Sequence, residues 1–156
     1  MKKIILVQPP SPFLLIEKWN LPINLLYLKG FLEKENHKIE LINLADIKNY
    51  LEAIPLNADI YGVSMFTPHH NLGIEIGKYL KKNTNALLVG GGHHVSAIPQ
   101  DFLENSEFDI VVRREGELTF SEICNGKTFQ EIKGISHKLN GKVSIILIEI
   151  LLKILI

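Results

Sequence analysis

Short apolar runs alternate with longer amphipathic stretches along the 156-residue chain. Several runs are continuously apolar, including those at 4–7 and 86–89. A strand covered on both faces has this pattern, whereas a strand with one wet face alternates apolar and polar residues. We therefore expect buried strands at 3–8, 38–44, 60–66, 86–91 and 108–114.

The stretches between these runs carry apolar residues at helical spacing. Leucines at 21, 25, 28 and 32 form one stripe of a helix that opens at Pro22 and ends near Asn36. Thr67 and Pro68 combine a capping hydroxyl with a proline at the first helical position, which predicts the start of another helix. We also expect Asp46 to cap a short helix, and the further helices lie at 46–54, 99–105 and 117–124.

Strands that alternate with helices favour a parallel sheet sandwiched between helices. The predicted fold is a three-layer α/β domain over residues 1–144, Rossmann-like or flavodoxin-like, with strand order 2-1-3-4-5 and helices on both faces. Asn140 and Gly141 predict the turn of a C-terminal hairpin over 134–144. The apolar tail 145–156 fits a last strand or helix, a segment buried by further chain, or an out-of-frame end.

Composition narrows the classes of partner. The 17 basic and 17 acidic residues balance, so nothing indicates a nucleic acid or an anionic membrane as partner. Cys124 is the single cysteine, which fits a reducing compartment and excludes a multi-cysteine metal or iron–sulfur site within the chain. The first apolar run is too short for a signal peptide, and no run reaches the roughly 18 residues of a membrane helix. We expect a cytoplasmic protein.

Ligands of open α/β sheets bind beyond the carboxyl ends of the strands. Here that edge would gather residues 8–11, 64–67, 90–93 and 113–117. Glycines 90–92 permit positive φ and leave room for a ligand against the backbone, and free amides at helix starts can hold an anion. These glycines could equally do no more than make a tight turn from strand to helix.

For other side chains near this edge, a role in ligand binding has to be weighed against a purely structural one. His69, His70, His93 and His94 suggest a metal site, but no third ligand with a known spacing accompanies any pair. Arg113 and Arg114 could contact a phosphate, or pair with neighbouring glutamates in solvent. Trp19 could cover a ligand or simply pack against its neighbours.

The order of these segments resembles a known family. Residues 3–142 are similar to the cobalamin-binding domain at the N-terminus of cobalamin-dependent radical S-adenosylmethionine enzymes. The resemblance is carried by "VQPP", "LPINLLYLKGFLEKENHKIELINL", "ADIYGVSMFT", "LLVGGGHHVSAIPQDFLENSEFDIVVRREGE" and "FQEIKGISHKLNGK". It implies that the carboxyl edge binds a corrin, whose nucleotide tail inserts between the sheet and its flanking helices.

The resemblance also assigns site residues by position. The loop after the first strand would face the lower side of the ring, and the loop after the third strand would meet the tail. The glycines would let the tail pass, with a histidine lining the passage, and an acidic turn follows the fifth strand. In the same order, these residues are Pro9, Pro10 and Ser11; Ser64, Phe66 and Thr67; Gly90, Gly91, Gly92 and His93; and Glu115, Gly116 and Glu117.

Two departures from the family pattern limit what the resemblance implies. The loop after the first strand has no histidine, so it cannot supply the cobalt ligand that many cobalamin-binding domains carry there. The cysteines of a radical enzyme's iron–sulfur cluster are absent, because Cys124 alone cannot hold a cluster. We therefore expect a cobalamin-binding module without catalytic residues, isolated or truncated, whose barrel partner would be a missing segment or a separate chain.

Two other classes of function stay open at this point. A receiver-like signalling domain needs clustered aspartates after the first strand, which this chain lacks, and a flavin site needs a phosphate loop there, for which Ser11 is the only hydroxyl. Besides the cobalamin-binding module and this nucleotide-binding or signalling domain, the third hypothesis is an inert stub of a disrupted gene, which the apolar tail favours.

Overall fold

The computed structural model describes residues 1–146, in which seven strands form one sheet of order β2-β1-β3-β4-β5-β6-β7. The first five strands are parallel, and β6 and β7 add an antiparallel hairpin beside β5. This confirms the predicted fold class and the predicted order of the first five strands; the hairpin strands β6 and β7 extend the same sheet. The strands are β1 (Lys3–Gln8), β2 (Lys38–Asn43), β3 (Ile60–Ser64), β4 (Leu87–Gly91), β5 (Ile110–Val112), β6 (Ile135–Leu139) and β7 (Lys142–Ile145).

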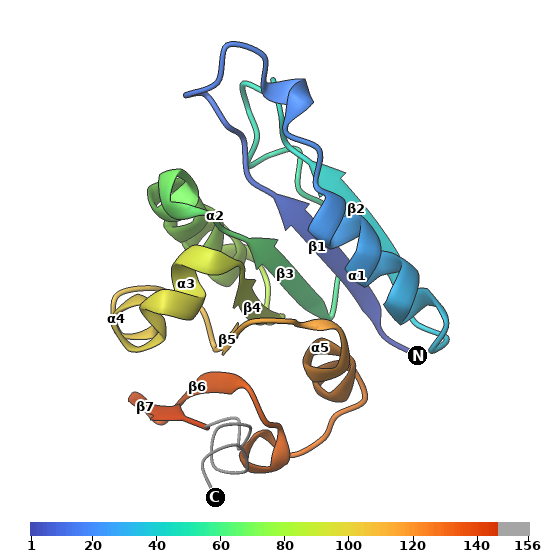
Figure 1. The fold of residues 1–156 in the computed structure, drawn as a ribbon, viewed down its shortest axis with the longest axis vertical. Helices are drawn as coiled ribbons and strands as arrows, with labels where there is room; N and C mark the ends of the chain where they lie inside the picture. The colour runs from blue at the N-terminus through green and yellow to red at the C-terminus, as the bar shows by residue number, and fades with distance from the viewer. Residues whose placement is uncertain (147–156) are drawn as a thin grey trace, which may run out of the picture.

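Helices cover both faces of the sheet. Figure 1 shows α2, α3 and α4 together on one side, with α1 and α5 on the other. Four of the helices match predicted ones, and α3, a single short turn after the glycines, is additional. The helices are α1 (Ile23–Glu33), α2 (His70–Asn83), α3 (His93–Ala97), α4 (Pro99–Glu104) and α5 (Glu117–Cys124), with 3-10 turns η1 (Glu17–Trp19), η2 (Thr67–His69) and η3 (Phe129–Glu131).

The central strands divide the interior into two cores, because successive side chains point to opposite faces. In β1, Ile5 and Val7 pack with the α2–α4 side, whereas Ile4 and Leu6 pack with the α1–α5 side. All four side chains are fully buried. Continuous apolar sequence in this strand therefore follows from having a helical layer on each face.

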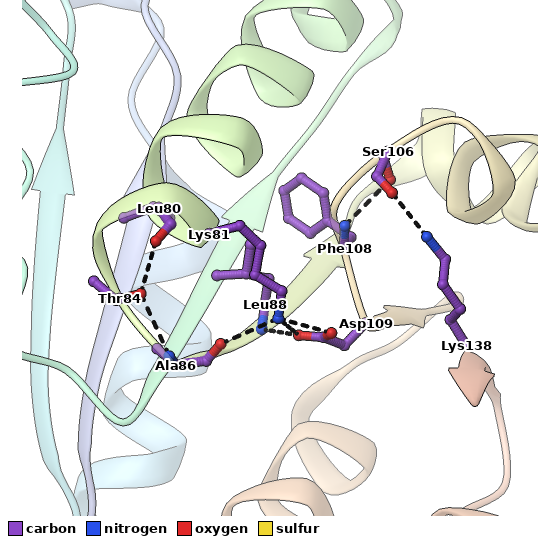
Figure 2. A network of polar contacts seen from close by, with 9 residues as sticks. All are labelled: Leu80, Lys81, Thr84, Ala86, Leu88, Ser106, Phe108, Asp109 and Lys138. Atoms are coloured by element: carbon purple, nitrogen blue, oxygen red, sulfur yellow. Dashed lines mark hydrogen bonds and ion pairs between the residues drawn. The ribbon is translucent and has the colours of Figure 1, made fainter. Parts of the chain in front are cut away.

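A carboxylate ties the amino-terminal edge of the sheet together (Figure 2). Asp109 lies just before β5, and its oxygens accept hydrogen bonds from Lys81 Nζ at 2.7 and 2.8 Å. It also accepts the backbone N–H of Leu88 in β4 at 2.8 Å. The C-terminal turn of α2 and two neighbouring strands are thus joined at the edge opposite the predicted site.

Two predicted helix starts are wrong in detail. Asp46 adopts a positive φ of 60°, and its N–H donates to Glu17 Oε2 at 3.3 Å, so residues 46–54 form successive turns rather than a helix. Aspartate tolerates this conformation better than most residues. Thr67 does not cap α2: it begins the 3-10 turn η2, whose first bond runs from His69 N–H to Phe66 O at 2.9 Å.

The predicted hairpin is confirmed. Asn140 and Gly141 both have positive φ, 50° and 75°, which is the geometry of a type I′ turn. β7 extends to Ile145, and Ile146 N–H donates to Ile135 O at 3.0 Å. The remainder of the expected apolar tail, 147–156, lies outside the described residues. Within 1–146, no helix is both long and apolar enough to cross a membrane.

The turn after β4 requires a glycine at position 92. Gly92 has φ 103°, and a Cβ built there would lie 2.5 Å from Met65 O and 2.9 Å from Met65 N. Met65 lies in the connection after β3, so the two loops approach each other through backbone atoms alone. A side chain at position 92 would therefore require the main chain of one of these loops to shift, because no flexible side chain is available to give way.

We predict that Gly92→Ala lowers the free energy of unfolding by at least about 2 kcal/mol, through backbone strain and the contact with Met65. Gly126→Ala is the matched control, because Gly126 also has positive φ (76°) but open space around its Cβ position. That variant should lose only about 1 kcal/mol, the cost of positive φ. Chemical denaturation measures both, and equal losses would contradict the proposed contact.

Candidate cofactor-binding site

A cavity of about 870 Å³ lies at the carboxyl edge of the sheet, on the side of α1 and α5. Its volume is in the range of sites that enclose a small molecule or a large part of a cofactor. The inner wall is apolar and comes from β1, β3, β4, β5 and both helices. These wall residues are Leu6, Leu25, Leu28, Gly62, Val89, Val112 and Phe120.

Polar and charged residues lie among the same lining. Asn24 Nδ2 donates to Ser64 Oγ at 2.7 Å, which joins the start of α1 to the end of β3. Arg114 has a positive φ of 65°, and its N–H donates to Ser96 Oγ at 3.3 Å. Glu115 and Glu117 also line the cavity. The cavity thus combines an apolar wall with hydrogen-bonding groups of both kinds.

Most of the residues predicted for the site line this one cavity. The exceptions are Thr67, which is exposed, and the loop after β1, where Pro9, Pro10 and Ser11 are buried but do not line it. The residues that the cavity brings together are Ser64, Phe66, Gly90, Gly91, Gly92, His93, Glu115, Gly116 and Glu117.

The three consecutive glycines have three different surroundings. A Cβ at Gly90 would point to the α2–α4 side, 3.2 Å from both Met65 Cε and Phe102 Cε1. Gly92 makes the turn described above. A Cβ at Gly91 would meet no atom within 4 Å, and Gly91 lines the cavity. Of the three, Gly91 is therefore the position where a side chain would occupy the cavity without disturbing the fold.

Aromatic rings and histidines surround the loops at this edge. Phe66 stacks on His93 with ring centroids 5.9 Å apart and an interplanar angle of 29°. His94 Nε2 and His70 Nδ1 are hydrogen-bonded at 2.9 Å, and burial, with the nearby His70, lowers the pKa of His94. Among residues 1–146, no three histidine, cysteine or acidic side chains are grouped to hold a metal ion.

A buried network joins the loop after β1 to the loop after β3. Ser11 Oγ is hydrogen-bonded to His69 Nε2 at 2.9 Å and accepts from Asn20 Nδ2 at 3.0 Å. Phe66 N–H donates to His69 Nδ1 at 3.4 Å. Because Nδ1 accepts, the proton of the neutral ring lies on Nε2, which donates to Ser11. Ser11 therefore faces a donor rather than a base, which excludes activation of its hydroxyl by His69.

His69 is only 1% exposed, and burial lowers its pKa from the ordinary value. The folded state thus favours the neutral ring, and the unfolded chain binds more protons below about pH 6.5. The stability that His69 contributes is complete above that pH and is lost as the pH falls towards its folded pKa.

We predict that His69→Gln reduces the decline in unfolding free energy between about pH 7 and pH 5, because the glutamine does not titrate. Urea denaturation of both proteins across this range measures the difference. At pH 7 the variant should be less stable by about 1–3 kcal/mol, since its shape cannot reproduce both ring contacts. If the variant shows the same decline in unfolding free energy with falling pH as the wild type, His69 is excluded as its source.

The cavity lining does not include Arg113, Cys124 or Trp19, three residues that the sequence had singled out. The Arg113 guanidinium donates to the carbonyl oxygens of Ile135 and Ile146, and burial lowers its pKa. Burial raises the pKa of the Cys124 thiol to about 12, so it is not a thiolate near neutral pH. Trp19 is 80% exposed in the loop before α1 and does not line the cavity.

Sequence reasoning missed the contribution of α1 to the site. Ile23, Asn24 and Tyr27 line the cavity beside the leucines of the predicted stripe. The available signal was Asn24, a polar residue one turn before Leu28 at the sheet-facing side of the helix. Its role depends on the 2.7 Å contact with Ser64, which is 40 residues away in the sequence.

The doubly wound sheet and the cavity beyond its strand ends define a cofactor-binding α/β domain. The chain belongs to the family of B12-binding domains, whose family model matches residues 19–124. This confirms the resemblance predicted from the sequence and cobalamin as the cofactor of the family.

The chain spans only part of the similar proteins described next. An uncharacterized methyltransferase of Pyrococcus horikoshii is 31% identical over 90% of this chain, which spans about a third (34%) of the relative. TsrM from Kitasatospora setae, a radical S-adenosylmethionine methyltransferase solved with cobalamin and a [4Fe-4S] cluster bound, has a TM-score of 0.78 at 21% identity. That match covers 95% of this chain and 29% of TsrM.

A second solved structure has the same fold. OxsB, a cobalamin-dependent S-adenosylmethionine radical enzyme solved with aqua-cobalamin and S-adenosylmethionine, has a TM-score of 0.70 at 23% identity. The match covers 96% of this chain and 22% of OxsB. At these identities the two structures establish the fold of the present chain.

Proposed function

We propose that the cavity beside α1 and α5 holds the nucleotide tail of cobalamin, with the corrin ring at the carboxyl edge of the sheet. The observation that carries this proposal is the space in front of Gly91, where a Cβ would meet no atom within 4 Å. A strand end left open on an otherwise packed sheet fits a flat ligand group that approaches the backbone.

The lining fits such a tail chemically. The apolar wall around Leu6, Val89 and Phe120 suits the face of an aromatic base, whereas Ser64 and Arg114 offer hydrogen bonds to the polar parts of the tail. Ser64 is oriented by Asn24, which leaves its own hydroxyl proton free to be donated. Bound cobalamin would supply methyl-transfer chemistry that no side chain of residues 1–146 provides.

The loop after β1 would lie below the ring without ligating its cobalt. It contains no histidine, and His69, the imidazole bonded to it, has both ring nitrogens engaged. We assign Pro9, Pro10 and Ser11 to shaping this floor. Phe66, Thr67 and His93 are assigned to the rim on the β3 and β4 side, and Glu115, Gly116 and Glu117 to the rim beside α5.

We further propose that the module serves a radical S-adenosylmethionine methyltransferase, with the radical-enzyme barrel supplied by a further segment or a separate chain. The support is the similarity to longer enzymes of this kind, of which the chain spans about a third or less. The absence of a cysteine trio in the sequence means that the cluster would belong to the barrel.

The test is binding of hydroxocobalamin to the purified chain. We expect the visible absorbance spectrum of the corrin to stay with the protein through desalting, and Trp19 fluorescence to be quenched to saturation. Gly91→Val should weaken binding by about 10- to 100-fold, the effect of overfilling a well-shaped site by 1–3 kcal/mol, while the fold is retained.

Gly30→Val is the matched control, because Gly30 is exposed on α1 and a Cβ there also meets no atom within 4 Å. It should bind hydroxocobalamin as the wild type does. If the wild type retains no corrin and its fluorescence does not saturate, the proposal fails for this chain. Equal binding by Gly91→Val would move the tail out of this cavity.

A further inference from the structure

Gln8, the last residue of β1, carries a buried amide without hydrogen bonds. Its side chain is 2% exposed, and neither Nε2 nor Oε1 has a partner among residues 1–146. A buried polar atom left unpaired costs about 1–3 kcal/mol, and a primary amide presents both a donor and an acceptor. A strand residue with two such atoms needs an explanation, and a partner that binds from outside the fold supplies one.

Gln8 lies next to the cavity without lining it. Side chains alternate along β1, so Gln8 lies on the same face as Leu6, which lines the cavity. β1 and β3 pair in register at Val7 and Val63, which places Gln8 beside Ser64, another lining residue. Gln8 therefore stands at the carboxyl edge on the α1–α5 side.

The polar neighbours of Gln8 on the same edge already have partners. Asn43 pairs with Gln8 in the β1–β2 register, and its Oδ1 accepts the Ala45 N–H at 3.1 Å. Ser64 Oγ accepts from Asn24. In this row of three strand ends, the amide of Gln8 is the group with both atoms unused.

We propose that Gln8 is a cofactor-binding residue whose amide pairs with a primary carboxamide on the rim of the corrin ring. The inference rests on the proposed function and adds to it a residue and the group it recognises. A primary amide complements another primary amide through two hydrogen bonds, one in each direction. A phosphate offers acceptors only and would leave Oε1 unpaired, and an apolar ring would leave both atoms unpaired. The rim of cobalamin carries such carboxamides.

This assignment predicts opposite effects on stability and on binding. Gln8→Met keeps the length of the side chain and removes both polar atoms. The melting temperature without cofactor should rise by about 2–4 °C, because unpaired atoms leave the interior. The affinity for hydroxocobalamin should fall by about 10-fold, because a bonded amide of the cofactor loses its partner. A purely structural glutamine would lower the melting temperature instead.

Ser136→Ala is the matched control. Ser136 Oγ on β6 is also buried without a partner among the described residues, but Ser136 pairs with Val111, whose side chain packs on the α2–α4 side, away from the cavity. The control should raise the melting temperature as Gln8→Met does and leave the affinity unchanged. A comparable loss of affinity in Ser136→Ala would show that the effect is not local, which overturns the assignment.

The ligand series then identifies the recognised group. Cobinamide has the corrin carboxamides and lacks the nucleotide base, so Gln8→Met should weaken cobinamide and hydroxocobalamin by the same factor. A loss confined to hydroxocobalamin would place Gln8 at the tail and overturn the amide pairing. If the wild type binds hydroxocobalamin and Gln8→Met binds it equally well, the Gln8 assignment alone fails. If the wild type binds neither corrinoid, the proposed function fails and the Gln8 assignment with it.

Discussion

The approach of β3 and β4 at their carboxyl ends determines the geometry of the site. Met65 N–H donates to Gly91 O at 2.8 Å, and Met65 O accepts from His94 N–H at 3.4 Å, so main-chain atoms hold the two connections together. Only a glycine fits at position 92, where a Cβ would lie 2.5 Å from Met65 O. This contact turns the chain into α3 and leaves Gly91 facing the cavity. The open strand end in front of the cavity is thus a consequence of backbone packing behind it.

Much of the fold could be predicted because its determinants are local. The continuously apolar runs mark strands with two covered faces, and Asn140-Gly141 specifies its turn by itself. The prediction failed where the conformation depends on distant partners. Asp46 is held in a turn by Glu17, 29 residues earlier, so its capping preference did not decide the local structure.

The candidate site, like the fold, could be predicted from the sequence only in part. The topology of a parallel sheet alone brings the ends of β3, β4 and β5 to one edge, so Ser64, Gly91 and Glu115 could be predicted as neighbours. The role of Asn24 could not, because it requires the packing of α1 against β3. Nor could the sequence show that Gln8 is buried without a partner, since a glutamine at a strand end is ordinarily solvated.

The two faces of the sheet differ in what they contain: one is a packed core, and the other includes the cavity. On the α2–α4 side, glycines allow close packing: a Cβ at Gly73 would lie 2.2 Å from Met65 Sδ, and one at Gly77 would lie 2.7 Å from Phe108 Cε2. That side therefore forms a dense core from the sheet to the helices. The α1–α5 side contains the cavity and the unpaired amide of Gln8, both of which reduce stability. A cavity of this size can be maintained on the α1–α5 side because the dense core on the opposite face contributes stability.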